Sequence, residues 1–320
     1  MNLLIAFLAL LVERLLGYPD TLFKVIGHPV SWIGKLIGML EKRFNTASAP
    51  FEKRREYGAL CLATLLVLVF AITVPISLAL RSLPFGWLIE AVLASSFLAQ
   101  KGLGDAVAKV QTALEDGPIE NAQEAVSHIV GRDTSALDEP EIARAAIETL
   151  AENTSDGVVA PLLYLVIFGL PGIALYKAIN TADSMIGHRS ERYLAYGWAA
   201  AKVDDIANFI PARLTAILFA ASALVVSGAS ASKAWATATR DAKKHASPNA
   251  GWPEAAMAGA LDFGLGGPRS YQGQFLDLPQ MGDGRRDLGA TDIGRALNLY
   301  QRLLWVLILS TGLAAIFFAL

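Results

Sequence analysis

The chain has 320 residues and a formal net charge of −2; 54% of its residues are apolar and 18% are charged. Soluble domains carry about 25% charged residues. Together with a mean hydropathy of +0.43, this composition favours an integral membrane protein and excludes an ordinary soluble enzyme, a disordered chain and a coiled coil. The small net charge gives no general attraction for nucleic acid. The single cysteine, Cys61, excludes an internal disulfide and a multi-cysteine zinc site.

An apolar segment opens the sequence at residues 1–20. No basic residue precedes its apolar stretch, Glu13 and Arg14 interrupt it, and no Ala-x-Ala site follows it. These features do not fit a secretory signal peptide. We therefore expect a first helix that is retained in the protein.

The next segment, residues 18–57, is basic, with seven Lys or Arg against four Asp or Glu. Its tract Lys53-Arg54-Arg55 comes directly before a long apolar run. Basic loops stay on the cytoplasmic side of bacterial membranes, so we expect this segment in the cytoplasm.

Several later segments are apolar enough to be membrane helices, which need about 20 apolar residues. Residues 59–80 are 22 residues without a charge, with an expected kink at Pro75. Residues 303–320 are an uncharged run of 18 that forms a further span. Two weaker segments, 84–100 and 206–229, each hold one charged residue.

Residues 157–176 are also uncharged, but Pro161 and Pro171-Gly172 interrupt them. Such a segment forms either one broken span or a re-entrant hairpin, because backbone groups freed at a break can be satisfied inside a bundle. The two alternatives place the following segment on opposite sides of the membrane, and the sequence leaves both open.

The polar regions complete the expected architecture. Residues 100–156 hold four basic and twelve acidic residues, and their apolar positions have helical spacing, which predicts a soluble helical insert. These apolar positions are Leu103, Val107, Val110 and Leu114. Residues 230–302 are expected to form a polar loop region that contains Gly and Pro. Since strand-like alternation is almost absent, we predict one all-α domain over 1–320, a polytopic membrane bundle with about 4–6 membrane helices.

The densest chemistry lies from Glu152 to Arg213, beside the apolar segments. Ionisable groups at membrane depth cost about 2.5–3.5 kcal/mol each, so they usually face a cavity or a partner. Lys177, Asn180 and Asp183 recur at i, i+3 and i+6, which places them on one face of a helix.

A second set follows in the next segment, where Asp204 and Asn208 are four residues apart and Asp205 lies beside them. Carboxylate and amide oxygens suit Mg²⁺. The cations Lys177 and Arg213 suit phosphate oxygens, and arginine can bind them with two hydrogen bonds. The functional hypothesis is a metal–phosphate site at the membrane face; the structural alternative is a set of interhelical ion pairs and helix caps.

Other patterns are less specific. Residues 27–34 predict a turn that enters an amphipathic helix, and residues 247–254 predict a polar turn before a segment of small residues suited to close helix packing. No GxxxxGK[ST] or GxGxxG pattern occurs, so any nucleotide would be bound by another arrangement. The histidines form no HxxxH pair, and no GxSxG pattern is present.

Six long segments occur together in one order: GHPVSWIG at 27–34, ENTSDGVVAPLLY at 152–164, YKAINTADSMIGHRSERY at 176–193, GWAAAKVDDIANFIPARLTA at 197–216, SPNAGWPEAAMAGAL at 247–261 and LGGPRSYQG at 265–273. With these segments the sequence resembles the CobD/CbiB family of cobalamin biosynthesis, the membrane-bound adenosylcobinamide-phosphate synthases. The resemblance covers nearly the whole chain and is weakest in the acidic insert.

The resemblance implies an enzyme that forms a carbon–nitrogen bond. It would ligate (R)-1-amino-2-propanol, or its O-phosphate, to the free carboxylate of adenosylcobyric acid and give adenosylcobinamide or its phosphate. The implied cofactors are ATP and Mg²⁺, and the corrinoid is a substrate. The implied location is the bacterial inner membrane, with several passes through it. The implied partners are membrane lipid and a second copy of the chain or other cobalamin-assembly enzymes, but no nucleic acid.

Roles for individual residues follow from their chemistry at these positions. We expect Asp183, Asp204 and Asp205 to hold Mg²⁺, with Asp156 as a further carboxylate. Lys177 and Arg213 are expected to bind phosphate. Glu152 or His28 would act as the base for the amine. Four amides would orient the substrates: Asn153, Asn180, Asn208 and Asn249.

Three other functions fit parts of the pattern. Another Mg²⁺-dependent membrane transferase would need spaced aspartate motifs, and here the acidic pair is adjacent. A non-catalytic membrane sensor resembling AmpE would not need so many polar segments. A transporter would show inverted repeats, which are not found. Corrinoid-dependent product formation separates the enzyme from the sensor and the transporter.

Overall fold

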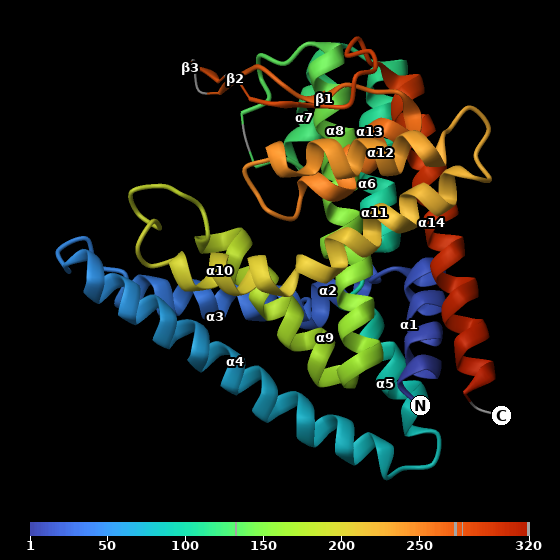
Figure 1. Cartoon of the computed structure of the whole chain (residues 1–320). Coiled ribbons are helices and arrows are strands. Elements are labelled where there is room, and N and C mark those ends of the chain that lie inside the picture. Colours follow the sequence, from blue (N-terminus) through green and yellow to red (C-terminus); the bar gives the residue numbers. More distant parts are fainter. Residues whose placement is uncertain (132, 272–273, 277, 319–320) are drawn as a thin grey trace. The chain divides into compact units, whose positions relative to one another are not determined.

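The structure is a computed structural model that describes residues 1–131, 133–271, 274–276 and 278–318. Most of these residues are helical, which confirms the prediction of a helical protein (Figure 1). The chain forms two compact units, and each is assembled from stretches that are separated in the sequence. The two units are described one after the other.

The first unit contains Met1–Ala99, Ala160–Asn208 and Thr311–Leu320. Its helices are α1 (Asn2–Leu16), α2 (Asp20–Ile26), α3 (Pro29–Phe44), α4 (Phe51–Arg81), α5 (Gly86–Ser95), α9 (Ala160–Ile186) and α10 (Trp198–Ala207). Helix α4 packs on α9, and α1 packs on α5.

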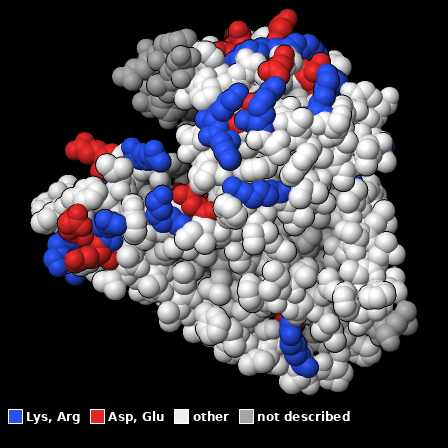
Figure 2. Space-filling model, in the orientation of Figure 1, with Lys and Arg blue, Asp and Glu red and all other residues white. Residues whose placement is uncertain are grey.

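Helix α4 is the longest uninterrupted apolar helix of this unit. It has 31 residues, includes Pro75 and contains the whole predicted span 59–80. Its side chains Val67, Phe70 and Leu78 are more than half exposed. Figure 2 shows charged side chains at the two ends of α4 and an uncharged surface between them. An exposed apolar surface of this kind is unfavourable in water and suits lipid.

Helix α9 contains the predicted break. Its backbone leaves the helical conformation at Gly169, where φ is 69°, two residues before Pro171. The helix changes direction sharply along its length (Figure 1). A Cβ atom at position 169 would lie 2.9 Å from the guanidinium of Arg81, so glycine fits this position for both its conformation and its space.

The second unit contains Gln100–Val159 and Phe209–Ser310. Its helices are α6 (Gln100–Asp116), α7 (Ile119–Ser127), α8 (Glu139–Thr154), the π-helical turn η1 (Ser155–Val159), α11 (Phe209–Ala223), α12 (Ala231–Asp241), the 3₁₀ turn η2 (Ala242–Lys244), α13 (Gly251–Leu261) and α14 (Ala290–Phe317), which continues into the first unit. The acidic insert therefore forms α6, α7 and α8, as its spacing predicts.

Helix α13 is the core of this unit and packs against α8, α11 and α12. Its small residues are buried, and a Cβ atom at Gly259 would lie only 2.4 Å from the carbonyl oxygen of Lys233 on α12. The small-residue segment thus allows the close helix packing expected from the sequence.

The polar region 230–302 is more ordered than its composition indicated, because it contains α12, α13 and four short strands. The strands are β1 (Leu265–Gly266), β2 (Arg269–Tyr271), β3 (Gln274–Leu276) and β4 (Gln280–Met281). They pair antiparallel as β1 with β4 and β2 with β3. Residues 272 and 273 of the predicted glycine-rich segment lie outside the described residues.

Among the described residues, three helical stretches are long and apolar enough to cross a membrane: Phe51–Arg81, Glu139–Ile186 and Ala290–Phe317. Two bent helix pairs raise the number to five if each pair counts as one span; these are Asn2–Leu16 with Thr21–Phe44, and Trp198–Ala207 with Phe209–Ala223. The predicted span at 84–100 is wrong, because α5 has only 10 residues. Such a helix is about 15 Å long, half the thickness of the hydrocarbon core.

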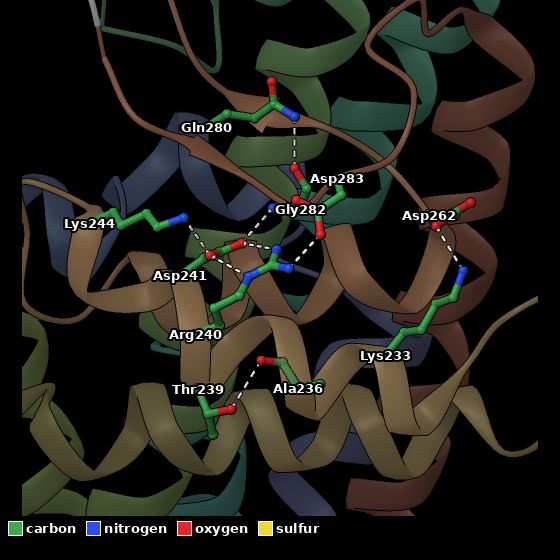
Figure 3. A network of polar contacts seen from close by, with 10 residues as sticks. All are labelled: Lys233, Ala236, Thr239, Arg240, Asp241, Lys244, Asp262, Gln280, Gly282 and Asp283. Atoms are coloured by element: carbon green, nitrogen blue, oxygen red, sulfur yellow. Dashed lines mark hydrogen bonds and ion pairs between the residues drawn. The ribbon is translucent and has the colours of Figure 1, made fainter.

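A network of hydrogen bonds and ion pairs connects the segment after β4 to the C-terminal end of α12 (Figure 3). The buried carboxylate of Asp241 accepts hydrogen bonds from Arg240, from Lys244 at 2.6 Å and from the backbone N–H of Gly282 at 2.9 Å. Burial alone would raise the pKa of Asp241, but these three donors outweigh it and hold the pKa well below its usual range. Arg240 also pairs with Asp283, so the network joins two segments that are distant in the sequence.

Replacing Asp241 with Asn should destabilise the protein by about 3 kcal/mol near neutral pH, since it leaves buried donors with a weaker acceptor. The folded pKa lies below the unfolded one, so the stabilisation is present above about pH 4 and is lost as pH falls through the folded pKa. Thermal unfolding in detergent should therefore show a difference in stability between wild type and Asp241→Asn that is constant from about pH 7 to about pH 4 and narrows as the pH falls further. Asp262→Asn, which removes the exposed partner of Lys233, is the control and should change stability by less than about 1 kcal/mol. A difference that does not depend on pH would contradict this account.

Candidate functional site

The residues predicted to form the site fall into two groups, one in each unit. The first unit holds His28, Lys177, Asn180, Asp183, Asp204, Asp205 and Asn208. The second unit holds Glu152, Asn153, Asp156, Arg213 and Asn249. Each group has its own geometry.

On α9, the side chains of Lys177, Asn180 and Asp183 are all half-buried, and Lys177 Nζ donates to Asn180 Oδ1 at 3.3 Å. The helical spacing predicted for these three residues is confirmed, because α9 runs to Ile186. A Cβ atom at Gly187 would lie 1.9 Å from Asp183 Oδ1. Glycine at the end of α9 therefore leaves room for this carboxylate.

The adjacent carboxylates of α10 have different surroundings. Asp204 is 8% exposed, and its Oδ2 accepts a hydrogen bond from Asn208 Nδ2 at 2.9 Å. Its Oδ1 is buried and accepts no hydrogen bond of normal geometry from any residue that the structure describes, although the side chain of Asn180 is close enough to act on this carboxylate. Asp205 is half-buried, and its Oδ2 lies 3.6 Å from Nζ of Lys202. Asp183 is close enough to act electrostatically on Asp204, so three carboxylates share one region of this unit.

Two tyrosines support this region, and sequence reasoning missed both. Tyr176 is fully buried and donates to Asn208 Oδ1 at 2.8 Å. Its ring stacks on Tyr164, with 5.0 Å between the ring centres, and Tyr164 donates to the carbonyl oxygen of Ala207 at 3.2 Å. A tyrosine inside an apolar helix needs a hydrogen-bond partner for its hydroxyl. The presence of both tyrosines in apolar segments could therefore have indicated these contacts. The tyrosines fix the C-terminal end of α10 and therefore the orientation of Asp204.

His28 caps the N-terminus of α3: its Nδ1 accepts the backbone N–H of Val30 at 3.2 Å. Its ring meets Tyr18 edge to face at 4.3 Å, and Lys177 is close enough to act on it electrostatically. A neutral histidine that accepts at Nδ1 carries its proton on Nε2. His28 can therefore offer an Nε2–H donor while the cap is intact. The turn and amphipathic helix predicted at 27–34 are confirmed by this cap.

In the second unit, three residues lie where α8 ends and the π-helical turn η1 begins. Glu152 is exposed, and Asn153 is half-buried and donates to the carbonyl oxygen of Thr149 at 3.1 Å. Asp156 is half-buried within η1. Single π-helical turns are frequent at functional sites, so the irregular backbone agrees with a functional role for this segment.

Arg213 of α11 is held on several sides. Its Nη1 donates to the carbonyl oxygen of Phe209 at 2.7 Å and to Asn249 Oδ1 at 3.0 Å. Its guanidinium lies 3.7 Å from the centre of the Phe209 ring and 4.9 Å from the Trp252 ring. Asn249 is buried, so it acts here as an acceptor for the arginine. Sequence reasoning missed both rings. Phe209 lies four residues before Arg213 on the same helix, and this spacing was an available signal. Trp252 lies on α13, so no local spacing could indicate its contact.

The carboxylates of the first unit fit a Mg²⁺ ion that arrives with a substrate. No group of three or more His, Cys, Asp or Glu in the described part of the chain is arranged closely enough to enclose a metal ion. Mg²⁺ is commonly bound by one or two carboxylates together with water and substrate phosphates. The buried Oδ1 of Asp204 would be one such ligand, with Asp183 and Asp205 as neighbours.

Comparison with known proteins identifies the family. A family model described as CobD/Cbib protein matches residues 6–300. The chain belongs to the CobD/CbiB family. No solved structure matches this chain.

Curated relatives extend over almost the whole chain. The cobalamin biosynthesis protein CobD of Rhodobacter capsulatus is 48% identical over 309 residues, which is 95% of each chain. The protein of the same name from Sinorhizobium fredii is 47% identical over 307 residues, covering 93% of this chain and 92% of the relative. That of Brucella suis is 44% identical over 322 residues, covering 99% and 98%.

Proposed function

We propose that this chain is an adenosylcobinamide-phosphate synthase that acts at the bacterial inner membrane. Its family and the printed name of its relatives support a role in cobalamin biosynthesis, and the apolar helices support a membrane location. The reaction joins (R)-1-amino-2-propanol, or its O-phosphate, to the free carboxylate of adenosylcobyric acid with consumption of ATP.

The proposed reaction has two steps. A carboxylate oxygen of the corrinoid attacks the γ-phosphorus of ATP, giving an acyl phosphate and ADP. The amine nitrogen then attacks the acyl carbon, the nitrogen loses a proton, and inorganic phosphate leaves as the amide forms. Catalysis of such transfers is mainly positioning and stabilisation of developing charge.

The observation that carries this proposal is the buried Asp204 carboxylate with one unpartnered oxygen. Burying a charged oxygen without a partner costs free energy, so its presence favours a function that supplies one. Asp183, Asp204 and Asp205 would hold Mg²⁺, which neutralises charge on the ATP phosphates when bound. Lys177 would bind a phosphate oxygen, since it is half-buried in the same region.

The remaining residues have supporting roles. Glu152 is the better base for the amine, because it is exposed, whereas His28 uses its Nδ1 as a helix cap. Asp156 is a further carboxylate near Glu152 in the sequence. Arg213 would bind a substrate oxyanion. Orientation of the substrates is the proposed role of four amides: Asn153, Asn180, Asn208 and Asn249.

The test is direct product formation. Purified full-length protein in detergent, given adenosylcobyric acid, Mg²⁺-ATP and either form of the amine, should release one ADP for each amide formed. Mass spectrometry of the corrinoid product reports which form of the amine is incorporated. Absence of any corrinoid amide with both amines, in protein that remains folded, would refute the proposed reaction.

A further inference from the structure

Arg213 presents one edge of its guanidinium with only one long hydrogen bond in the described structure. Its Nη1 is occupied by Phe209 and Asn249, and its Nη2 makes one long contact, 3.5 Å, with the carbonyl oxygen of Pro248. The edge formed by Nε and Nη2 binds nothing else in the described part of the chain. Two other arginines use this same edge to grip a carboxylate with two hydrogen bonds: Arg81 on Glu90 and Arg192 on Glu41.

The surroundings hold that edge in place. The Phe209 and Trp252 rings lie over the guanidinium, and Asn249 anchors its other side. An arginine fixed in this way loses little further freedom when it binds, so it is prepared for a planar oxyanion. The groups in contact with it are uncharged, which leaves a single positive charge. One charge matches a carboxylate better than the several negative charges of a nucleoside triphosphate.

An apolar surface continues from this arginine. The Trp252 ring lies 6.4 Å from the Trp235 ring of α12. Trp235 in turn lines a shallow groove of about 380 Å³ between α11 and α12, together with Ile217, Ala221 and Leu224. Trp235 is 43% exposed and Ile217 49% exposed. The second unit therefore presents the Nε–Nη2 edge of Arg213 next to an apolar groove. The indole rings of Trp252 and Trp235 lie between them.

We infer that this surface of the second unit binds the corrinoid acid, with its carboxylate on the free edge of Arg213 and its macrocycle against Trp252, Trp235 and the apolar groove. This inference rests on the proposed function for the identity of the acid. The one free carboxylate matches the arginine edge, and the methyl groups that the macrocycle carries beside its amide side chains can lie against the indole rings and the apolar groove. Asn249 is then a positioning residue, because it acts on the acid through Arg213.

The experiment compares two ligands that differ only at the carboxylate: cobyric acid and the same corrinoid with that carboxylate converted to a primary amide. Binding to the purified full chain is measured without ATP by equilibrium dialysis and corrinoid absorbance. A two-bond contact to arginine should make wild type prefer the acid by about 10- to 100-fold. Arg213→Gln should remove the preference. Arg213→Lys should keep only a small part of it, since lysine cannot donate two parallel hydrogen bonds to one carboxylate.

Two further variants separate the parts of the surface. Trp235→Ala should weaken binding of the acid and of the amide by the same factor, about 10-fold, and leave the preference between them unchanged. Lys243→Gln changes an exposed cation of the same unit and should alter neither ligand. Circular dichroism and gel filtration confirm that each variant is folded.

Three outcomes would overturn the inference. One is an unchanged acid preference in Arg213→Gln. The second is a loss of affinity for a non-hydrolysable ATP analogue in that variant, which assigns the Nε–Nη2 edge to phosphate. The third is displacement of the corrinoid by phosphatidylglycerol but not by phosphatidylcholine in nanodiscs, which assigns the surface to lipid. Selective binding of the acid with no amide formed would instead refute the reaction and leave this site standing.

Discussion

Asp204→Asn should reduce turnover by at least about 100-fold while the protein stays folded, because it removes a negative charge that would hold Mg²⁺ beside the transferring phosphate. The same substitution should stabilise the protein without ligand by about 1–3 kcal/mol, since a buried and unpartnered charged oxygen is replaced by a neutral amide. Opposite effects on activity and stability are the mark of a functional carboxylate. Product formation and thermal unfolding of the same preparations measure both effects.

The Asp204→Asn variant should also respond less to Mg²⁺ than wild type. If Asp204 is a ligand, the thermal stabilisation of wild type by Mg²⁺ with a non-hydrolysable ATP analogue should be smaller in the variant. Asp183→Asn and Asp205→Asn should abolish turnover as well. Glu56→Gln is the matched control, because Glu56 is an exposed carboxylate paired with Lys53 three residues away. Near-wild-type turnover in Asp204→Asn would refute the metal assignment.

Glu90→Ala should be the most destabilising single substitution proposed here, at about 3–5 kcal/mol, because it breaks a buried ion pair from one side. Glu90 is fully buried and accepts from Ser77 at 2.7 Å and from both Nε and Nη2 of Arg81 at 3.1 Å. Arg81 also donates to Asn2 at 2.7 Å. The pair therefore ties α4 to α5 and to the start of α1.

A mutant series isolates this effect. Glu90→Gln keeps the shape and an acceptor oxygen, so it should cost less than Glu90→Ala. The double variant Glu90→Gln with Arg81→Met should recover part of the loss, since no charge remains buried without its partner. Glu52→Ala, at an exposed position in the first turn of α4, should be nearly neutral. Unfolding midpoints in detergent measure the series; a midpoint for Glu90→Ala equal to that of wild type would contradict the role of the pair.

Local features of this protein could be predicted from the sequence. The apolar run at 59–80 lies within α4, and the His28-Pro29 turn begins α3. The small residues after 254 form the buried helix α13. Each of these features depends on residues close together in the chain, where spacing, caps and small side chains act directly.

The break in α9 shows the limit of local reasoning. Pro171-Gly172 indicated an interruption, and the backbone departs from helix at Gly169 instead. Gly169 is the residue near the proline that can adopt a positive φ, so the shift by two residues has a local cause. The guanidinium of Arg81, which would lie 2.9 Å from a Cβ atom at 169, comes from another helix, and this contact could not be predicted from 157–176.

The site was predicted as a set of residue types but not as an arrangement. Spacing placed Lys177, Asn180 and Asp183 on one face of a helix, because helix geometry is periodic. Spacing could not show that Asp204 is buried while Asp205 is half-exposed. Consecutive residues of a helix point about 100° apart, and the burial of either one depends on which neighbouring helix packs there.

The sequence by itself therefore determined the helical character, the apolar spans, the caps and the chemistry available along each helix. Only the tertiary structure decided that the predicted site residues divide between two compact units, that Tyr176 supports Asn208, and that Trp252 and Asn249 contact Arg213. Periodicity and capping arise from interactions within a few residues. Burial, unpartnered oxygens and ring contacts arise between segments far apart in the chain, where packing alone selects the neighbours.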